Sequence, residues 1–290
     1  MNFTNANKLL SICEEKGIPI SQAMIDREVL YLGKNIDETM NKMNEALTIM
    51  ENAVNRSINN PQKSIGGLIG GEAKKLTDHR EKFKPVCGNI ISKAISYAMG
   101  TLEINASMGL IVAAVTAGSS GVLPGVMLAL SEEFGFSDEQ LISALFNAGA
   151  IGHIISHNGT VSGAEGGCQA EVGSASAMAA SATVELMGGT PKQCLDAAGT
   201  ALTNLMGLVC DPIAGLVESP CQSRNAIGAS NALISAEIAL SGIEQVVPFD
   251  EIVIAMKLVG SSLAFELRET SLGGVAATPT GCKIKEKIFG

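Results

Sequence analysis

The sequence contains no tryptophan, and only 3% of its 290 residues are aromatic. A core built around large aromatic side chains is therefore excluded. Apolar residues nevertheless make up 46% of the chain, and glycine occurs 32 times. Because Ala, Val, Ile, Leu and Met must fill such a core, backbones have to approach one another closely, which favours tightly packed helices.

Positive charge is nearly absent from most of the chain. Between residues 94 and 282 the only basic side chains are those of Lys192, Arg224, Lys257 and Arg268. The formal net charge is −9 and no basic cluster occurs, which excludes nucleic acid as a partner. We predict an amphipathic helical region at 1–90 and a nearly charge-free helical body at 91–290, and the two could form one continuous domain.

No charged side chain occurs from Ile104 to Ser131, a stretch long enough to span a bilayer. Glycines, Pro124 and small polar residues interrupt this stretch, and glutamates rather than Lys or Arg flank it. We therefore expect a buried helix broken by a Gly-rich loop, with no membrane association. The first residues show no basic segment followed by an apolar one, so the expected location is the cytoplasm.

Helical periodicity dominates the sequence, and no stretch alternates with period two as a half-buried strand would. The predicted fold is therefore all-α, with buried small-residue helices and Gly-rich loops. Two capping boxes mark helix starts, Ser137 with Gln140 and Thr190 with Gln193. Further helices are predicted over residues 5–16, 37–56, 174–187 and 248–269. A Gly-rich tail is expected after the last of them.

Seven cysteines occur in a chain that shows no secretory signal, so a disulfide framework is not expected. Three of them lie in turns bounded by glycine or proline, namely Cys168, Cys210 and Cys221. Cys168 and Cys221 directly precede helical patterns, whose N-terminal amides would stabilise a thiolate-bound cluster or a substrate carboxylate. The spacing matches no zinc or ferredoxin pattern, so spacing alone leaves open whether the three bind metal or are buried turn residues.

Four segments carry a resemblance to a known family. They are Asn105-Ala-Ser-Met-Gly109, Ser162-Gly-Ala-Glu-Gly-Gly-Cys-Gln-Ala-Glu171, Cys210-Asp-Pro-Ile-Ala-Gly215 and Ser219-Pro-Cys-Gln-Ser-Arg-Asn225. Together they resemble the iron-sulfur-dependent L-serine dehydratases, over residues 64–282. The resemblance implies that Cys168, Cys210 and Cys221 hold a [4Fe-4S] cluster with one open iron. It also implies a lyase that converts L-serine to pyruvate and ammonia.

Members of this family occur as single chains or as separate α and β chains. The Ser-Ser-His-Thr motif of the family's other half is absent here. The resemblance is therefore to an isolated α chain, which needs a β chain to complete its active site. It further implies that the serine hydroxyl binds the open iron while a base removes the Cα proton.

Candidate substrate-binding residues lie in and between these segments. The serine carboxylate could be held by helix N-terminal amides or by polar side chains of the Gly-rich region, namely Asn105, Ser107, Thr116 and Ser119. Arg224 is an alternative clamp, although it could instead pair with Glu218 or cap carbonyl groups. Glu165 and Glu171 flank Cys168, and either could hold the substrate ammonium group or cap the following helix.

The catalytic candidates within this chain are His157, in the segment that leads to Cys168, and Glu165. The missing β chain is an alternative source of the base. His153, four residues before His157, is interpreted as a core histidine. Cys282 lies in the expected Gly-rich tail, and we hypothesise that it reaches the open iron when serine is absent.

Three other functions fit parts of the sequence. A pyridoxal-phosphate dehydratase performs the same net reaction, but neither Lys192 nor Lys257 adjoins a phosphate-binding loop, so no PLP is expected. A non-catalytic membrane or transport component is suggested by the uncharged stretch and a mean hydropathy of +0.28. A redox or scaffold iron-sulfur protein would need a fully ligated cluster and would not turn over serine.

Overall fold

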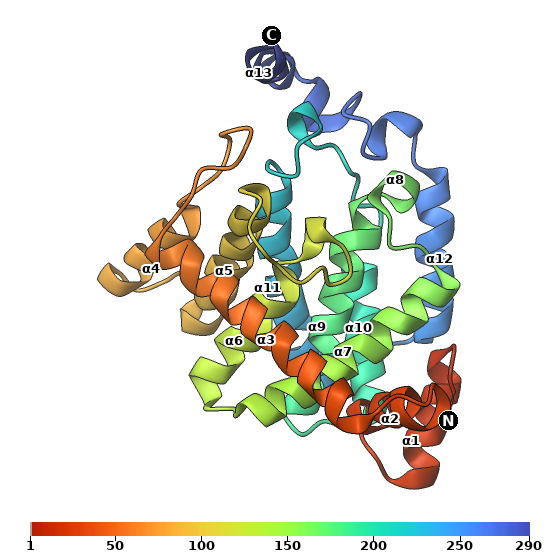
Figure 1. Cartoon of the computed structure of the whole chain (residues 1–290). Coiled ribbons are helices and arrows are strands. Elements are labelled where there is room, and N and C mark those ends of the chain that lie inside the picture. The colour runs from red at the N-terminus through yellow and green to blue at the C-terminus, as the bar shows by residue number, and fades with distance from the viewer. Residues whose placement is uncertain (1) are drawn as a thin grey trace.

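The computed structural model describes residues 2–290 as helices joined by loops (Figure 1). Within this range there is no β-strand, and the only strand-like pairing is an isolated bridge between Cys210 and Arg268. The all-α prediction is confirmed. The α-helices are α1 (Ala6–Lys16), α2 (Ile20–Asp26), α3 (Ile36–Asn59), α4 (Glu72–Lys82), α5 (Gly88–Ala106), α6 (Val122–Phe134), α7 (Asp138–Asn158), α8 (Gly163–Gly166), α9 (Ser174–Leu186), α10 (Pro191–Asn204), α11 (Cys221–Leu240), α12 (Phe249–Ser262) and α13 (Pro279–Phe289).

Short helical segments of other types connect these helices. They are the π-helical η1 (Arg27–Tyr31) and η3 (Gln169–Gly173) and the 3-10 turns η2 (Ala117–Ser119), η4 (Ile213–Gly215), η5 (Phe265–Leu267) and η6 (Gly274–Ala277). Most of them lie between residues 117 and 277, so the irregular backbone is concentrated in the part of the chain that carries the turn cysteines.

Helix α9 forms the centre of the molecule. Every residue from Ser174 to Val184 is buried, and most of these residues are Ala or Ser. Helices α6, α7, α10 and α11 all contact α9. Because Ala and Ser project little beyond the backbone, these helices can pack around α9 at short distances. The core therefore needs few aromatic side chains.

Helix α6 packs tightly against α5. A Cβ atom at Gly121 would lie 2.0 Å from the carbonyl oxygen of Ala98, and one at Gly125 would lie 2.7 Å from that of Ala94. Both distances are far inside van der Waals contact, so a side chain at either position would force the helices apart. The close packing of α5 and α6 therefore requires glycine at positions 121 and 125.

The uncharged stretch is divided as the sequence predicts. Helix α5 ends at Ala106, a loop that contains the 3-10 turn η2 follows, and α6 begins at Val122. In the part of the chain that the structure describes, no helix has both the length and the apolar character needed to cross a bilayer.

Helices α1 to α4 pack on the outside of the helices around α9, and buried residues such as Leu9, Ile20 and Leu47 join the same hydrophobic core. Helix α2 packs against α7, and α3 runs diagonally across α5, α6 and α7 (Figure 1). The start of α1 is capped from the other end of the chain, since the carboxylate of Asp250 accepts the N–H groups of Ala6 at 2.7 Å and Asn7 at 3.1 Å. The division of the chain near residue 90 stays a prediction.

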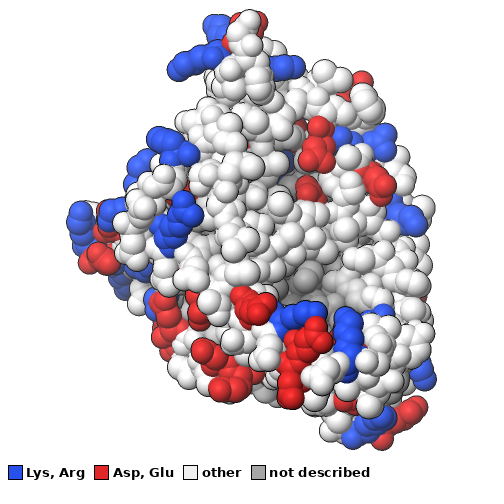
Figure 2. Space-filling model, in the orientation of Figure 1, with Lys and Arg blue, Asp and Glu red and all other residues white. Residues whose placement is uncertain are grey.

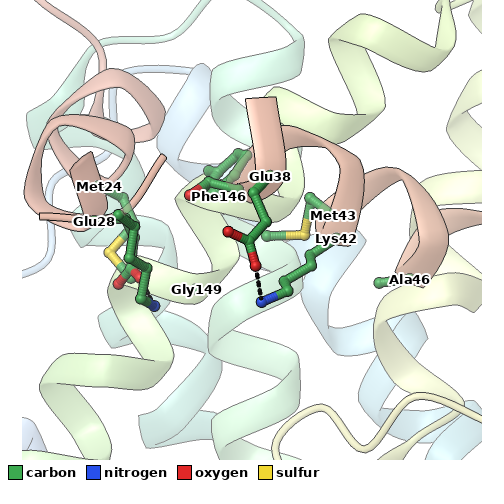
Figure 3. A pocket seen from close by; sticks show the side chains of 10 residues that line it. Met24, Glu28, Glu38, Lys42, Met43, Ala46, Phe146 and Gly149 are labelled. Atoms are coloured by element: carbon green, nitrogen blue, oxygen red, sulfur yellow. Dashed lines mark hydrogen bonds and ion pairs between the residues drawn. The ribbon is translucent and has the colours of Figure 1, made fainter. Parts of the chain in front are cut away.

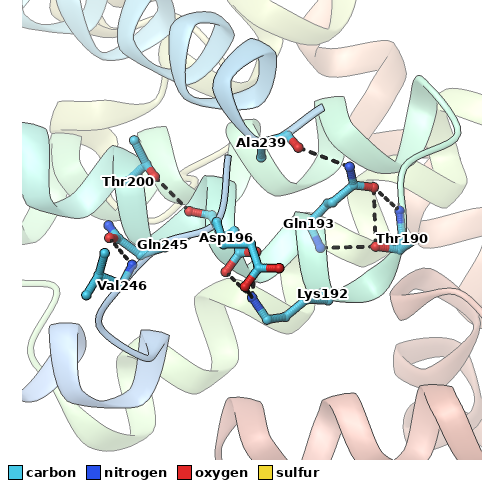
Figure 4. Close-up of polar contacts among 9 residues, drawn as sticks. Thr190, Lys192, Gln193, Asp196, Thr200, Ala239, Gln245 and Val246 are labelled. Atoms are coloured by element: carbon cyan, nitrogen blue, oxygen red, sulfur yellow. Dashed lines mark hydrogen bonds and ion pairs between the residues drawn. The ribbon is translucent and has the colours of Figure 1, made fainter. Parts of the chain in front are cut away.

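Both predicted capping boxes are present. The Thr190 N–H donates to Gln193 Oε1 at 2.9 Å, and the Gln193 N–H donates to Thr190 Oγ1 at 3.2 Å (Figure 4). The side-chain amide of Gln193 also donates to the Ala239 carbonyl at 3.0 Å, which ties the start of α10 to the end of α11. Ser137 and Gln140 form the same box at the start of α7.

Two predictions about the end of the chain are wrong. The helix predicted over 248–269 ends at Ser262, because the following segment turns to pair with Cys210. The predicted Gly-rich tail contains helix α13. Thr278 caps this helix by accepting the Gly281 N–H at 3.1 Å, and Pro279 occupies its first position, so the start signals were present in the sequence.

Candidate active site

Three thiols that are distant in the sequence line one cavity. Cys168, Cys210 and Cys221 are 4%, 4% and 8% exposed and border a space of about 210 Å³. The other lining residues are Thr116, Ala117, Gly118, Glu171, Pro212, Val217 and Glu269. The structure thus brings together the three cysteines that the sequence singled out, from three separate turns.

A larger cavity of about 410 Å³ lies between the α2–η1 segment, α3 and α7 (Figure 3). Its charged residues pair with each other, Lys42 with Glu38 at 2.9 Å and Lys34 with Glu28. No cysteine or histidine lines it. The cavity with the thiols is therefore the better candidate for catalysis.

Gln169 fixes the turn that carries Cys168. Its side chain is fully buried, accepts the Gly207 N–H at 2.8 Å, and donates to the carbonyls of Gly166 at 2.9 Å and Met256 at 3.0 Å. All three contacts are to backbone, so one amide group joins the Cys168 turn to the segment before Cys210 and to α12.

Arg224 fixes the turn that carries Cys210. Its guanidinium donates to the Val209 carbonyl at 2.8 Å and to Asp211 Oδ1 at 2.6 Å. The other carboxylate oxygen of Asp211 accepts the Val275 N–H at 2.7 Å. Arg224 thus has both of the structural roles considered for it, since it caps a carbonyl group and forms an ion pair. Its acidic partner is Asp211 rather than Glu218.

Cys210 itself is held through its backbone by the segment after α12. Its N–H donates to the Leu267 carbonyl at 2.8 Å, and its carbonyl accepts the Glu269 N–H at 2.7 Å. Glu269 adopts a φ of 63°, which is uncommon for a residue with a side chain. This pairing places Glu269 at the cavity wall.

Cys221 is the first residue of α11, as its helical pattern predicts. The turn before it is anchored by Glu218, whose buried carboxylate accepts hydrogen bonds from Ser64 Oγ and the Gly66 N–H, each at 2.6 Å, and from the Leu68 N–H at 2.9 Å. The glycines of the 64–71 loop allow this approach, because a Cβ at Gly66 would lie 2.3 Å from Leu216.

Burial dominates the electrostatics of the thiols. It raises the pKa of Cys168 and the pKa of Cys221 to about 12 each, against the lowering effect of the nearby Arg224 guanidinium. Burial also raises the pKa of Cys210, and the neighbouring Cys168 and Glu171 add to the rise. The thiols are therefore protonated at neutral pH unless bound positive charge stabilises their thiolates.

The donor set fits an iron-sulfur cluster, because cysteine thiolates are the protein ligands that hold such clusters. Three buried sulfurs around one cavity match the soft ligands that such a cluster requires.

Acidic groups complete the cavity wall. The Thr116 hydroxyl donates to Glu171 Oε1 at 2.7 Å, and Glu171 Oε2 lies 4.0 Å from the sulfur of Cys210. Burial raises the pKa of Glu171, the hydrogen bond from Thr116 opposes this rise, and the charge of Glu269 adds to it. This side of the cavity suits a cationic group such as an ammonium.

The predicted carboxylate-binding residues are not all at the cavity. Thr116 lines it, and Ser119 is buried behind Thr116 in the same capped turn. Asn105 donates its amide to the Ala117 carbonyl at 3.2 Å, and Ser107 donates its hydroxyl to the Ile104 carbonyl at 3.1 Å. Neither Asn105 nor Ser107 lines the cavity, so their visible contacts serve the α5–η2 connection.

The remaining candidates also lie outside the cavity lining. His157 is exposed, and its ring centroid lies 6.1 Å from that of His153, whose Nε2 is 3.1 Å from the Phe3 carbonyl. Glu165 is exposed and accepts the Thr160 hydroxyl at 2.6 Å. Cys282 is exposed on α13. The catalytic roles of His157 and Glu165 and the ligand role of Cys282 stay predictions.

Sequence reasoning missed Gln169, Asp211 and Glu269 as parts of the site. Gln169 and Asp211 directly follow Cys168 and Cys210, so their position next to a turn cysteine was an available signal. The sequence contains no such signal for Glu269, because the pattern around it predicts the end of a helix.

Comparison with known proteins identifies the family. The model of the family described as "Serine dehydratase alpha chain" matches residues 15–276. The chain is 48% identical to the probable L-serine dehydratase alpha chain of Bacillus subtilis over 99% of this chain and 96% of that one. It is 44% identical to the L-serine dehydratase alpha chain of Peptoniphilus asaccharolyticus over 99% and 98% of the two chains.

Another relative is a longer protein, of which this chain matches only a part. The chain is 36% identical to the L-serine dehydratase of Mycobacterium bovis, and the match covers 94% of this chain but 61% of the other. The matched family model and the near-complete coverage of two α chains lead to one conclusion: the chain belongs to the serine dehydratase alpha chain family.

Proposed function

We propose that this chain is the α chain of an iron-sulfur-dependent L-serine dehydratase, which converts L-serine to pyruvate and ammonia. The observation that carries the proposal is a cavity lined by three buried cysteines and two glutamates. The names of its relatives supply the substrate and the reaction. Membership of this family favours neither a PLP enzyme nor a transport component.

We propose that Cys168, Cys210 and Cys221 hold a [4Fe-4S] cluster. When bound through three protein thiolates, such a cluster supplies one iron without a protein ligand, which can act as a Lewis acid toward the serine hydroxyl. The chain's own contribution is to hold the three sulfurs in fixed turns and to keep them out of water. The Arg224 guanidinium lies close enough to Cys168 and Cys221 to favour their thiolate forms.

The net reaction removes the Cα proton and the hydroxyl of serine as water. The resulting aminoacrylate tautomerises to an imine, which takes up one water and releases ammonia and pyruvate. We propose that Glu171 and Glu269 hold the substrate ammonium. The cavity lining includes no Lys, Arg or His, so we assign the group that binds the substrate carboxylate to a β chain.

The test is anaerobic reconstitution of the α chain with iron and sulfide, followed by a serine-to-pyruvate assay with and without the β chain. We expect iron and sulfide to bind to the α chain alone and turnover to require both chains. Exposure to air should abolish turnover, and iron with reductant should restore it. Turnover by iron-free chains, or an absorption band of pyridoxal phosphate in active protein, would refute the proposal.

Glu171→Gln is expected to raise KM for serine by about 10- to 100-fold, because a charged hydrogen bond to the ammonium is lost. Gln keeps an acceptor for the Thr116 hydroxyl, so kcat should change less. Steady-state kinetics on the reconstituted enzyme measure both constants. Glu165→Gln is the matched variant: if it raises KM while Glu171→Gln does not, the ammonium is held at Glu165 instead.

A further inference from the structure

The cavity between the α2–η1 segment, α3 and α7 has no role in the proposed reaction. Its volume of about 410 Å³ lies in the range of small-molecule binding sites. Figure 3 shows Glu28 on one side of it and Glu38 and Lys42 on the other. It shares no lining residue with the thiol cavity. A molecule bound here would therefore be separate from the reacting serine.

One wall of this cavity is apolar, and we call its residues the apolar wall. They are Met24, Met43, Ala46 and Phe146, of which Phe146 is buried at 3% exposure. None of these side chains is a strong hydrogen-bond partner, so a hydroxyl or amide group placed against them would lose its bonds to water without replacement. Met side chains are flexible and adjust to ligands of different shape. The wall therefore suits an apolar group.

Gly149 keeps the cavity open at the middle of α7. Apart from its chain neighbours and the nearby helix backbone, the only heavy atom within 4 Å of a Cβ at this position would be Met24 Cε, at 4.0 Å. Gly152 in the same helix differs, because a Cβ there would lie 3.0 Å from Met178 Sδ. Glycine is unfavourable in a helix interior. Packing explains the glycine at 152 but not the one at 149, which leaves room for a ligand.

The rim of the cavity carries two positive and two negative charges. Lys34 pairs with Glu28, and Lys42 pairs with Glu38. Figure 2 shows acidic and basic side chains gathered side by side on the lower part of this face, where α2 and α3 lie in Figure 1. A ligand with one charge would meet a like charge as well as an opposite one, whereas a zwitterion finds a partner for each of its charges. The rim therefore favours a zwitterion.

The η1 segment brings Glu28 and Lys34 to the rim. It is π-helical from Arg27 to Tyr31, and π-helical turns are frequent at functional sites. The Lys34 N–H donates to the Glu28 carbonyl at 3.1 Å, which holds the two residues together. The Glu28 side chain is only 13% exposed, and the Arg27 guanidinium lies 3.1 Å from its Oε1. One acidic group of the rim is thus held in place before a ligand arrives.

We propose that this cavity binds a free α-amino acid with a large apolar side chain, such as leucine, methionine or phenylalanine. The ligand's side chain lies against the apolar wall, in the space that Gly149 leaves. Its carboxylate pairs with Lys34 and Lys42, and its ammonium group pairs with the two glutamates of the rim. Serine does not fit, because its hydroxyl would face the apolar wall without a partner. The site is therefore selective for amino acids other than the proposed substrate.

The first experiment titrates the full-length chain with L-leucine in a calorimeter and compares two analogues that each lack one charge. They are 4-methylpentanoate, without the ammonium group, and 3-methylbutylamine, without the carboxylate. We expect leucine to bind and each analogue to bind at least about 10-fold more weakly, since a charge-assisted pair is lost. Leucine should also raise the midpoint of thermal unfolding, because it binds the folded chain. L-Serine should not compete with leucine.

Two variants locate the binding site. Gly149→Leu fills the cavity from α7 and should weaken leucine binding by at least about 30-fold. Its thermal unfolding should not fall, because the added Cβ has room and leucine favours a helix. Lys42→Gln should weaken binding by about 5- to 10-fold. Lys74→Gln is the matched control, since Lys74 also lies in an exposed ion pair one helical turn long, and it should leave binding unchanged.

Three results would overturn the inference. They are the absence of both heat and a thermal shift with leucine, methionine and phenylalanine at about 10 mM, equal binding of either singly charged analogue, and undiminished binding of leucine by Gly149→Leu. The last result would place the amino acid elsewhere on the chain. None of these measurements needs iron or serine turnover, so a failure of the proposed function is distinguishable from a failure of this site.

Discussion

Changing Cys168, Cys210 or Cys221 to serine is expected to reduce the iron bound per chain and to lower serine turnover by at least about 1,000-fold. A serine hydroxyl stays protonated in a buried site and is a poor iron ligand. The loss corresponds to about 4 kcal/mol of transition-state stabilisation, which lies within what a Lewis-acid metal supplies. Iron analysis, the visible absorption spectrum and a pyruvate assay measure the effects separately.

Two other cysteines provide matched controls. Cys194 is fully buried on α10, where its sulfur lies 3.8 Å from the side-chain amide of Asn147, and Cys87 is exposed. Neither lines the cavity. Cys194→Ser and Cys87→Ser should keep the iron content of the unmodified chain. Equal iron content in all five variants would show that the three turn cysteines do not bind iron and only contribute to packing.

Asp211→Ala is expected to lower the free energy of unfolding by about 3 to 5 kcal/mol, because it leaves Arg224 without its acidic partner in a largely buried position. The side chains of Asp211 and Arg224 are 3% and 14% exposed. The variant also removes the acceptor of the Val275 N–H. Denaturant unfolding of the iron-free chain, with the slope checked for constancy, measures the change.

An exposed ion pair gives the control for this effect. Lys74 and Asp78 are 48% and 40% exposed and lie 2.9 Å apart one helical turn from each other on α4. Lys74→Ala should change the free energy of unfolding by less than about 1 kcal/mol. If Asp211→Ala had an effect equally small, the Arg224 guanidinium would be solvated rather than fixed, and it would be available to bind a substrate carboxylate.

Much of the helical structure follows from local signals in the sequence. The capping boxes at Ser137 and Thr190 predict the starts of α7 and α10, since each is satisfied within four residues. The end of α12 does not follow from such signals. It is set by hydrogen bonds between Cys210 and the residues after Ser262, which are distant in the sequence. A local sequence pattern cannot predict where a helix ends when a tertiary contact determines that end.

The candidate active site likewise has some features that local sequence predicts and others that only the fold reveals. Cys168, Cys210 and Cys221 stand out because glycine and proline bound their turns, and family resemblance gives them a common role. The choice between Glu165 and Glu171 is not local, because both flank Cys168 and only the fold shows that Glu171 lines the cavity. Arg224 is visible as a rare basic residue, but its engagement by Asp211 appears only in three dimensions.

The cap of α1 by Asp250 has a consequence for the nascent chain. The N–H groups of Ala6 and Asn7 find their acceptor 244 and 243 residues further along the sequence. At about 5 to 20 residues per second, a ribosome needs on the order of ten seconds or more to add that length. Until then the first helix lacks its tertiary cap, so it can dock in its final place only late in synthesis or after synthesis is complete. Because this contact joins residues that are distant in the sequence, we expect it to form slowly.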